Sequence, residues 1–417
     1  MTSRKGEFIG EMHPDTSDGA TPRRYFKEAN AMTLEELTTL DNICDAFYQC
    51  AKVSFWKEST QRFRANLLLK ALELQEDLRA EKYEVSQTID FTLYERGKRR
   101  QINAPVIRDR VVQKLLMNHI LTPALTRPLI YDNYASLKGR GTSLARKRMD
   151  VHLQRYIRKH GTDGYILQVD IKKYFESIDH ETLKRLYRKE VHEPDEIMRL
   201  IDYIIDTSSK TGVGLNLGSE CPQIFAIYYL HTIDTWLKVV CGEKYYGRYM
   251  DDIYVISDNK EYLKELLQGI RERLTELKLE VNEKKTHITK LTHGFTFLQL
   301  KYNFNGNHIV KRLTHEKIAR ERRRLKAFRR LTTKGKMTQV KAYNCYKSWR
   351  QTAIKDSNAC YNSIQSIDRL FRELYPNCKT TDKKNRTDIT NMIFSEVDPQ
   401  DIEAMWELTR RRSCYDD

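Results

Sequence analysis

The sequence Tyr249-Met250-Asp251-Asp252 places two adjacent carboxylates between two apolar stretches, residues 244–249 and 253–257. Two strand-like stretches separated by so short a polar segment predict a β-hairpin with the acids at its turn. Carboxylates are ligands of hard cations, which proteins often hold together with substrate phosphates. The motif therefore suggests a metal-dependent phosphoryl-transfer site, although an Asp pair taken alone is also ordinary turn material.

The length and charge of the chain indicate a multidomain protein with a polyanionic partner. Its 417 residues are enough for two or three domains. Lys and Arg total 73 against 57 for Asp and Glu, which gives a net charge of +16. Residues 311–330 alone hold ten basic and two acidic residues. We therefore expect nucleic acid as the partner, with this segment as one of its contacts.

The sequence contains no feature of a membrane or secreted protein. Residues 1–22 are polar rather than a leader, and no apolar run approaches the roughly 20 residues that cross a bilayer. The eight cysteines are scattered without a Cys-x-x-Cys pair, which predicts buried or free thiols and argues against a zinc site. We expect a cytoplasmic protein without a membrane partner.

The first third of the chain predicts helices followed by a basic hairpin. Residues 33–36 have the form of a capping box, and apolar residues follow at helical spacing; a second helical stretch covers residues 60–78. Strand-like residues 84–93 and the basic stretch 97–105 then predict a hairpin. Arg grips phosphate through a bidentate fork, so its basic residues suit a triphosphate or a template backbone.

A third acid stands at the end of a short apolar strand, residues 165–170, which ends in Asp170. Phosphoryl transfer to a growing strand uses two divalent metals about 3.5–4 Å apart, and these need carboxylates from at least two places in the chain. Asp170 can meet the Asp251-Asp252 pair if its strand and the hairpin are neighbours in one sheet. This hypothesis makes the three acids one site.

The remaining elements predict an α+β sheet with helices on one face. A glycine-rich loop, residues 211–223, runs into an apolar helix, and such helix starts suit anionic or base-pairing ligands. An amphipathic helix over residues 261–278 follows the hairpin, and residues 294–302 form an aromatic strand near a turn. The basic segment 311–330 and residues 338–375 have helical spacing.

In this order, the motifs over residues 94–302 resemble the bacterial reverse transcriptases of group II introns, retrons, diversity-generating elements and phage-defence systems. The resemblance implies the α+β right-hand polymerase fold, with fingers and palm built from an antiparallel sheet packed on helices, and a helical thumb. The implied division is an N-terminal helical extension (1–85), fingers and palm (86–310), a basic helical thumb (311–376) and a polar C-terminal tail or appendage (377–417).

The resemblance also implies roles for individual residues. Two Mg²⁺ ions, or Mn²⁺ in their place, are expected on Asp170, Ile171, Asp251 and Asp252. The three acids are the expected catalytic residues, and Lys285 joins them as the lysine that meets the pyrophosphate. Residues 294–302 resemble the primer grip. The expected nucleotide-binding residues are Arg100, Arg108, Phe175, Leu217, Gly218 and Gln223, with the ring of Phe175 excluding a ribose 2′-hydroxyl.

One loop departs from the family pattern. Most members carry Gln-Gly followed three residues later by Ser-Pro, whereas this chain has Leu217-Gly218 and then Pro222-Gln223. An aliphatic residue before the glycine resembles the diversity-generating type, although that type keeps Ser where Pro222 stands. Loss of a polar side chain from the nucleotide pocket predicts relaxed fidelity or an unusual choice of template.

The predicted function is an RNA-directed DNA polymerase that makes cDNA from an RNA template, a dedicated non-coding RNA, using deoxynucleoside triphosphates, in anti-phage defence. The alternatives are a low-fidelity diversity-generating enzyme and a non-catalytic nucleic-acid-binding module. A templated RNA polymerase or terminal transferase is a further class, and Phe175 argues against the first of these. No nuclease, zinc-finger or hydrolase motif is present, which disfavours retrohoming with an endonuclease of its own. An oligomer is compatible with the sequence.

Overall fold

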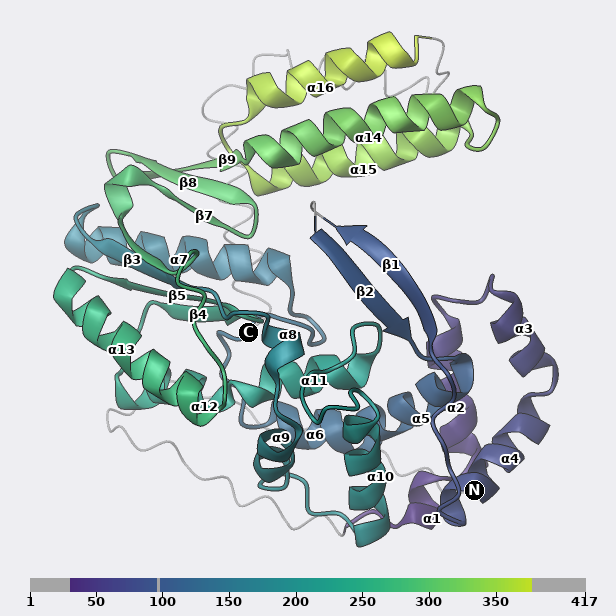
Figure 1. The fold of residues 1–417 in the computed structure, drawn as a ribbon. Coiled ribbons are helices and arrows are strands. Elements are labelled where there is room, and N and C mark those ends of the chain that lie inside the picture. The colour runs from purple at the N-terminus through teal and green to yellow at the C-terminus, as the bar shows by residue number, and fades with distance from the viewer. Residues whose placement is uncertain (1–30, 96–97, 377–417) are drawn as a thin grey trace, which may run out of the picture. The chain divides into compact units, whose positions relative to one another are not determined.

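A computed structural model describes residues 31–95 and 98–376. The polar N-terminal stretch and the predicted tail 377–417 lie outside the described residues. The described chain divides into two compact units, which are considered separately. The first contains the residues up to 124 together with 184–210 and 217–221. The second contains residues 125–183, 211–216 and 222–376, and Figure 1 traces both.

The first unit begins with a run of short helices. The predicted capping box is present, because Thr33 Oγ1 accepts from Glu36 N and Thr33 N donates to Glu36 Oε2. The apolar residues expected at helical spacing after this box are divided between two helices, because the side chain of Thr39 caps a second helix. The helices are α1 (Leu34–Leu37), α2 (Leu40–Ala51), α3 (Glu58–Ala65), α4 (Leu67–Arg79), α5 (Ile107–Leu116) and α10 (Asp195–Asp206).

The basic hairpin is present in the first unit as the two-stranded antiparallel sheet of β1 (Ile89–Glu95) and β2 (Lys98–Ala104). Short helical turns, η1 (Met117–Leu121) and α6 (Thr122–Thr126), follow α5. Helices α9 (His180–Tyr187) and α11 (Glu220–Tyr229) each have residues in both units.

The second unit is built on a four-stranded antiparallel sheet with strand order β4-β5-β3-β6. Its strands are β3 (Tyr165–Val169), β4 (Tyr246–Tyr249), β5 (Asp252–Ser257) and β6 (His287–Lys290). This sheet contains the predicted hairpin and the strand that precedes Asp170. The α+β class predicted from the sequence is confirmed.

Helices cover both faces of this sheet rather than the one face that was predicted. Ile166 and Ile256 share a core cluster with α7 (Thr142–His160). Their strand neighbours Leu167 and Val255 point to the opposite face and are equally buried. Helix α13 (Lys260–Glu276) packs against β3 and β5, and Figure 1 shows α7 and α13 on either side of the strands. Both strand faces are apolar, so both need a helix.

A second antiparallel sheet contains β7 (Phe295–Phe297), β8 (Leu300–Asn305) and β9 (His308–Leu313). The single aromatic strand predicted for residues 294–302 is therefore two strands. The chain turns between them at Leu298 and Gln299, which have φ angles of 44° and 66°. The division predicted between residues 310 and 311 falls inside β9.

The remaining short elements are α8 (Tyr174–Ser177), α12 (His231–Thr235), η2 (Trp236–Val240) and η3 (Leu291–His293). The apolar helix predicted from residue 224 is thus three consecutive pieces, α11, α12 and η2. Within the described part of the chain, every helix is too short or too polar to span a bilayer.

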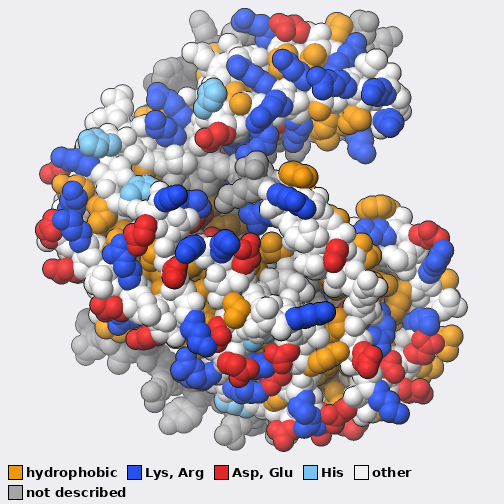
Figure 2. All heavy atoms as spheres, viewed as in Figure 1, with side chains coloured by type: hydrophobic (Ala, Val, Ile, Leu, Met, Phe, Trp, Pro, Cys, Tyr) orange, Lys and Arg blue, Asp and Glu red, His pale blue; other side chains and the backbone are white. Residues whose placement is uncertain are grey.

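Three helices close the described chain: α14 (His315–Thr333), α15 (Gln339–Asp356) and α16 (Tyr361–Leu374). Leu325, Ala342 and Ile367 are fully buried among them, and the ring of Tyr346 stacks on Phe371 with centroids 4.1 Å apart. Figure 2 shows Lys and Arg side chains gathered over this bundle. The basic helix predicted from the sequence therefore buries one stripe and exposes its charge.

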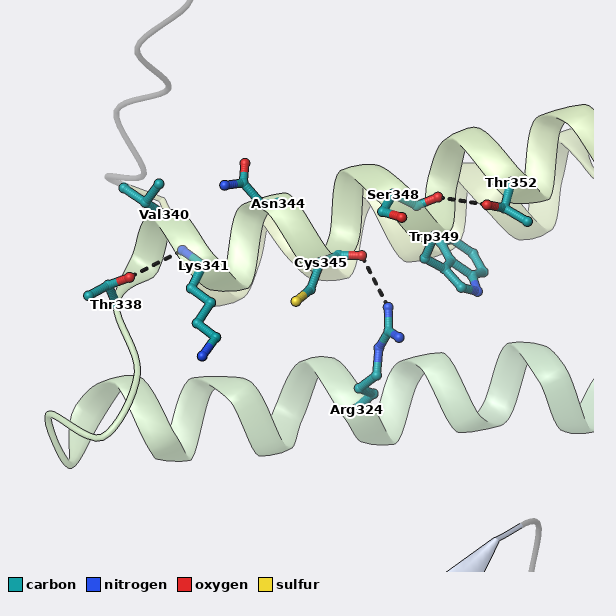
Figure 3. A pocket seen from close by; sticks show the side chains of 9 residues that line it. All are labelled: Arg324, Thr338, Val340, Lys341, Asn344, Cys345, Ser348, Trp349 and Thr352. Atoms are coloured by element: carbon teal, nitrogen blue, oxygen red, sulfur yellow. Dashed lines mark hydrogen bonds between the residues drawn. The ribbon is translucent and has the colours of Figure 1, made fainter. Parts of the chain in front are cut away.

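A groove of about 610 Å³ runs between α14 and α15 (Figure 3). Arg324 lies on its α14 side, and its guanidinium donates to the carbonyl of Cys345 across the groove. The lining mixes basic, polar and apolar groups: Arg324, Thr338, Val340, Lys341, Asn344, Cys345, Ser348, Trp349 and Thr352.

Candidate active site

The sheet register of the second unit brings Asp170 and Asp252 together. Strands β3 and β5 are antiparallel and pair Val169 with Ile253. The next position outward therefore sets Asp170 opposite Asp252, at a separation of about 5 Å between Cα atoms. The condition stated from the sequence, that the strand and the hairpin be neighbours in one sheet, is met.

The hairpin turn itself has an unusual backbone. Tyr249 pairs with Asp252, so Met250 and Asp251 alone form the turn. Met250 has φ 54°, in the left-handed region that residues with a side chain seldom occupy. Such conformations persist when the surroundings hold them, and they gather at functional sites. Asp251 is thus presented from a constrained turn, next to Asp252 at the start of β5.

The carboxylate of Asp170 is held on both oxygens. Asn282 Nδ2 donates to Oδ1 at 2.7 Å, and Lys285 Nζ lies 2.6 Å from Oδ2. The main chain of Asp170 is tied to the same loop, because its carbonyl accepts from Asn282 N at 2.8 Å and its N–H donates to Thr286 Oγ1 at 3.3 Å. The segment that follows α13 is therefore fastened to the end of β3.

Lys285 is the cation shared by the three acids. Partial burial acts to lower the pKa of Lys285. The hydrogen bond to Asp170 and the negative charges of Asp170, Asp252 and Asp251 outweigh it, so this pKa is raised above its ordinary value. The negative charges of all three carboxylates therefore act on one ammonium group, whose hydrogen-bonded partner is Asp170.

The donor set fits a divalent cation. Carboxylate oxygens are hard ligands, and the ammonium of Lys285 marks where they attract positive charge. Ile171 has no side-chain donor, so it can contribute only its main-chain carbonyl. Among the described residues, no three His, Cys, Asp or Glu side chains already stand as a formed metal cluster. Asp170 would have to exchange Lys285 for the ion.

Phe175 lies in α8, five residues after Asp170, and the glycine-rich loop supports it. The N–H of Leu215 donates to the carbonyl of Phe175, and Gly214 N donates to Ile178 O, both at 2.8 Å. A side chain on Gly214, which has φ 99°, would come within 3.2 Å of the Glu176 carbonyl. The loop thus runs close beside α8 only because glycine occupies this position.

The other predicted nucleotide-binding residues are divided between the two units. Arg100 is exposed on β2, opposite Leu93. Arg108 is engaged within the first unit, where it donates to Asp77 at 2.7 Å and to the Glu84 carbonyl at 2.9 Å. A triphosphate would therefore have to replace existing partners of Arg108.

The loop residues Leu217 and Gly218 belong to the first unit, and Gln223 belongs to the second. Gly218 has φ 135°, and a side chain there would come within 3.3 Å of the Asn103 carbonyl on β2. Leu217 is half-buried, while Gln223 is exposed in the first turn of α11. Gly218 and the basic hairpin are therefore close neighbours within the first unit.

Four further polar residues lie next to the acids or beneath their turn, and none of them was predicted from the sequence. Asn282 and Thr286 hold Asp170, as described above. Arg248 and Asp234 form a fully buried ion pair beneath the hairpin turn. A spacing pattern could not have identified these residues, because each acts through a contact between distant segments. Only Arg248 had a signal in the local sequence, since it immediately precedes the Tyr249 motif.

Replacing Lys285 with Met is expected to tighten the binding of Mn²⁺ to the free protein about fivefold. The change removes a unit charge a few ångströms from the ion. Electron paramagnetic resonance of free Mn²⁺ measures the affinity. Lys172→Met is the matched control, because Lys172 pairs with Glu280 at 2.8 Å instead of with the acids. An equal gain in both variants, or none in Lys285→Met, would contradict the shared-cation geometry.

Comparison with known proteins identifies the family of the chain. The family model described as "Reverse transcriptase (RNA-dependent DNA polymerase)" matches residues 87–302, just over half of the chain. Among curated proteins, the Retron Ec48 reverse transcriptase of Escherichia coli is 22% identical over 217 residues. That match covers 51% of this chain and 49% of the relative, so this chain matches about half the length of that relative.

Solved structures of telomerases show weaker likeness. Apo telomerase from Candida Tropicalis, truncated from its C-terminal domain, has a TM-score of 0.42 and 16% identity over 58% of this chain and 60% of that chain. Telomerase from Candida albicans with a fragment of telomeric RNA has a TM-score of 0.44 and 12% identity over 69% and 55%.

The family match spans β1 to β8 and includes Asp170, the acidic hairpin and Lys285. Domains of this kind generally depend on divalent metals, and their fold is the α+β right-hand polymerase fold that the sequence predicted. On this match, the chain belongs to the reverse transcriptase family.

Proposed function

We propose that the protein is an RNA-directed DNA polymerase that extends a primer on an RNA template by two-metal nucleotidyl transfer. The single observation that carries this proposal is the pairing of β3 with β5, which sets Asp170 opposite Asp252 beside the Asp251 turn. The alternative of a non-catalytic binding module gives no reason for acids from a strand end and a hairpin turn to meet at one end of a sheet.

Asp170, Asp251, Asp252 and the Ile171 carbonyl would hold two Mg²⁺ ions, or Mn²⁺. Bound there, the metals would lower the pKa of the primer hydroxyl and stabilise the leaving oxygen. Asn282, 2.7 Å from Asp170 Oδ1, keeps that carboxylate oriented. Lys285, once released from Asp170, is free to donate to the departing pyrophosphate.

The chain's other segments take the parts that the family implies. Residues 86–310 serve as fingers and palm, and 311–376 serve as a thumb whose basic surface follows the nucleic-acid backbone. Arg100 and Arg108 meet the triphosphate, Gly218, Leu217 and Gln223 line the nucleotide pocket, and residues 1–85 support the fingers. Deoxynucleoside triphosphates are the substrates, and the products are RNA-templated DNA strands.

The retron relative favours a dedicated non-coding RNA as template and a role in anti-phage defence. The second candidate is diversification of a target gene. It is favoured by Leu217, which stands where most members of the family carry Gln. A cytoplasmic location and an oligomeric assembly stay predictions.

Asp251→Ala should abolish primer extension, with a loss of at least about 1,000-fold. One metal-binding carboxylate is removed, and no neighbouring group replaces its charge. The assay follows a DNA primer on an RNA template with deoxynucleotides and Mg²⁺. Asp258→Ala, at the far end of the same hairpin, is the matched control and should retain activity. Wild-type protein without Mg²⁺-dependent extension would reject the proposal.

Phe175→Ala should admit ribonucleotides. The half-buried ring is expected to fill the space that a 2′-hydroxyl would need. We expect the preference for deoxynucleotides, measured as the ratio of kcat/KM values, to fall by about 10- to 200-fold, the range for a missing steric contact. An unchanged ratio in a variant that is still active would remove Phe175 from the sugar pocket.

Leu217→Gln should lower the error rate on a defined RNA template, because it restores a polar side chain to the loop. We expect about a tenfold reduction, measured by sequencing the cDNA. Leu215→Gln is an unsuitable comparison because Leu215 is buried, so Asn216→Gln, in the same loop, is the control. Equal error rates for the wild type and Leu217→Gln would contradict relaxed fidelity.

A further inference from the structure

The largest fully buried side chain near the candidate site is the guanidinium of Arg248, in β4 two residues before Met250. Its partner is Asp234 of α12, and the two side chains are 0% and 1% exposed. Charged residues are almost never buried so completely unless they are paired. Removing two charges from water is costly, and a buried ion pair often stabilises a fold no better than apolar residues of similar volume.

The pair has well-formed geometry. Arg248 Nε lies 2.7 Å from Asp234 Oδ1, and Nη2 lies 2.5 Å from Oδ2. The hydroxyl of Tyr246 donates to the same carboxylate. Burial acts to lower the pKa of Arg248, but the charge of Asp234 and its hydrogen bonds outweigh this effect and raise it. The guanidinium of Arg248 therefore keeps its positive charge inside the protein.

The guanidinium has two further partners, and both are main-chain carbonyls. Nη2 donates to Ile227 O at 2.8 Å in α11, and Nη1 donates to Met250 O at 3.0 Å. The main chain of Arg248 is fixed as well, because its N–H donates to Asp132 O and its carbonyl accepts from Tyr134 N, both at 2.9 Å. One end of the guanidinium is anchored in the helices, and the other end reaches the turn.

The contact at Met250 acts directly on the acids. The Met250 carbonyl belongs to the peptide unit that leads into Asp251, and this unit is planar. Holding its oxygen therefore also fixes the direction of the Asp251 N–H and the position of the Asp251 Cα. Met250 has φ 54°, a conformation that needs support from its surroundings.

We propose that Arg248 and Asp234 are positioning residues that hold the Met250 turn and so keep Asp251 and Asp252 in metal-binding geometry. This role rests on the proposed polymerase function. Arg248 faces the protein interior and touches no reacting group, so its effect passes through the turn. A lysine cannot replace it, because one ammonium group cannot reproduce the planar fork that spans the carboxylate and two carbonyls.

The test compares Arg248→Lys with Arg148→Lys. Arg148 also grips an aspartate with two nitrogens, Asp132 at 2.7 and 3.3 Å, but it makes no bond to the turn. Thermal unfolding, binding of Mn²⁺ alone, and kcat and KM for deoxynucleotides on an RNA template are measured for each variant. A positioning role changes kcat and the affinity for Mn²⁺ while KM stays nearly constant. A mere loss of stability lowers the unfolding temperature without these changes.

Arg248→Lys should lower kcat about 100-fold, the effect of a misplacement of about 1 Å. It should weaken Mn²⁺ binding about tenfold, as changes behind metal ligands do, and leave KM within about threefold. Asp234→Asn, which keeps its shape but loses its charge, should give a smaller loss of the same kind. Arg148→Lys should keep kcat and Mn²⁺ affinity within about twofold, even with an equal loss in unfolding temperature.

A folded Arg248→Lys protein with wild-type kcat and Mn²⁺ affinity would overturn the proposal. So would losses in Arg148→Lys that match those in Arg248→Lys. If Arg248→Lys does not fold, the double variant Arg248→Met with Asp234→Leu replaces the ions by apolar groups. Wild-type Mn²⁺ affinity in that variant would also overturn it, and weakened affinity would support it.

The proposed function and the positioning role can fail separately. A wild-type protein that does not extend a primer on RNA would reject the polymerase. The Mn²⁺ affinities of Arg248→Lys and Arg148→Lys would still decide whether the buried pair holds the turn.

Discussion

The antiparallel pairing of β3 with β5 is the constraint on which the candidate site depends. Its register sets Asp170 opposite Asp252 and leaves Asp251 in the adjoining turn. A shift of one residue would move every side chain of the strand to the other face, so the apolar packing on both faces also fixes the acids. Strand β6 pairs with β3 as well, with Gln168 opposite His287. Lys285 stands two residues before His287, which brings it to the end of β3 that carries Asp170.

The candidate site uses two cations in different ways. Lys285 lies at the surface beside Asp170, where it is half exposed and can be displaced. Arg248 is buried beneath the turn, where Asp234 neutralises its charge and its remaining hydrogen bonds hold the main chain. The exposed cation can leave when a metal arrives, while the buried one keeps the turn in place. The two cations therefore suit different tasks, one in exchange and one in geometry.

Much of this arrangement could be predicted from local patterns. The hairpin at Asp251-Asp252 and the strand before Asp170 followed from short apolar stretches, and the capping box at Thr33 followed from spacing. Local patterns failed where non-glycine residues adopt positive φ angles, as at Leu298, which divides one predicted strand into two. They also failed for helices on the second face of the sheet.

The buried pair of Arg248 and Asp234 could not be predicted, because a charged residue in a strand suggests an exposed position. Asn282 was equally hidden, since its bond to Asp170 joins residues 112 positions apart. The assignments of Arg100, Phe175, Leu217 and Gln223 come from the family resemblance and stay predictions. Contacts between distant segments, more than composition, decide which polar residues serve the site.

The proposed chemistry requires Asp170, Asp251 and Asp252 to hold divalent metal at one point. The most direct measurement is anomalous scattering from Mn²⁺ in crystals of the protein with a primer, an RNA template and a non-hydrolysable deoxynucleotide. We expect Mn²⁺ bound by carboxylate oxygens of Asp170 and Asp251, with Lys285 displaced from Asp170. Crystals with Mn²⁺ elsewhere, and Lys285 still on Asp170, would contradict it.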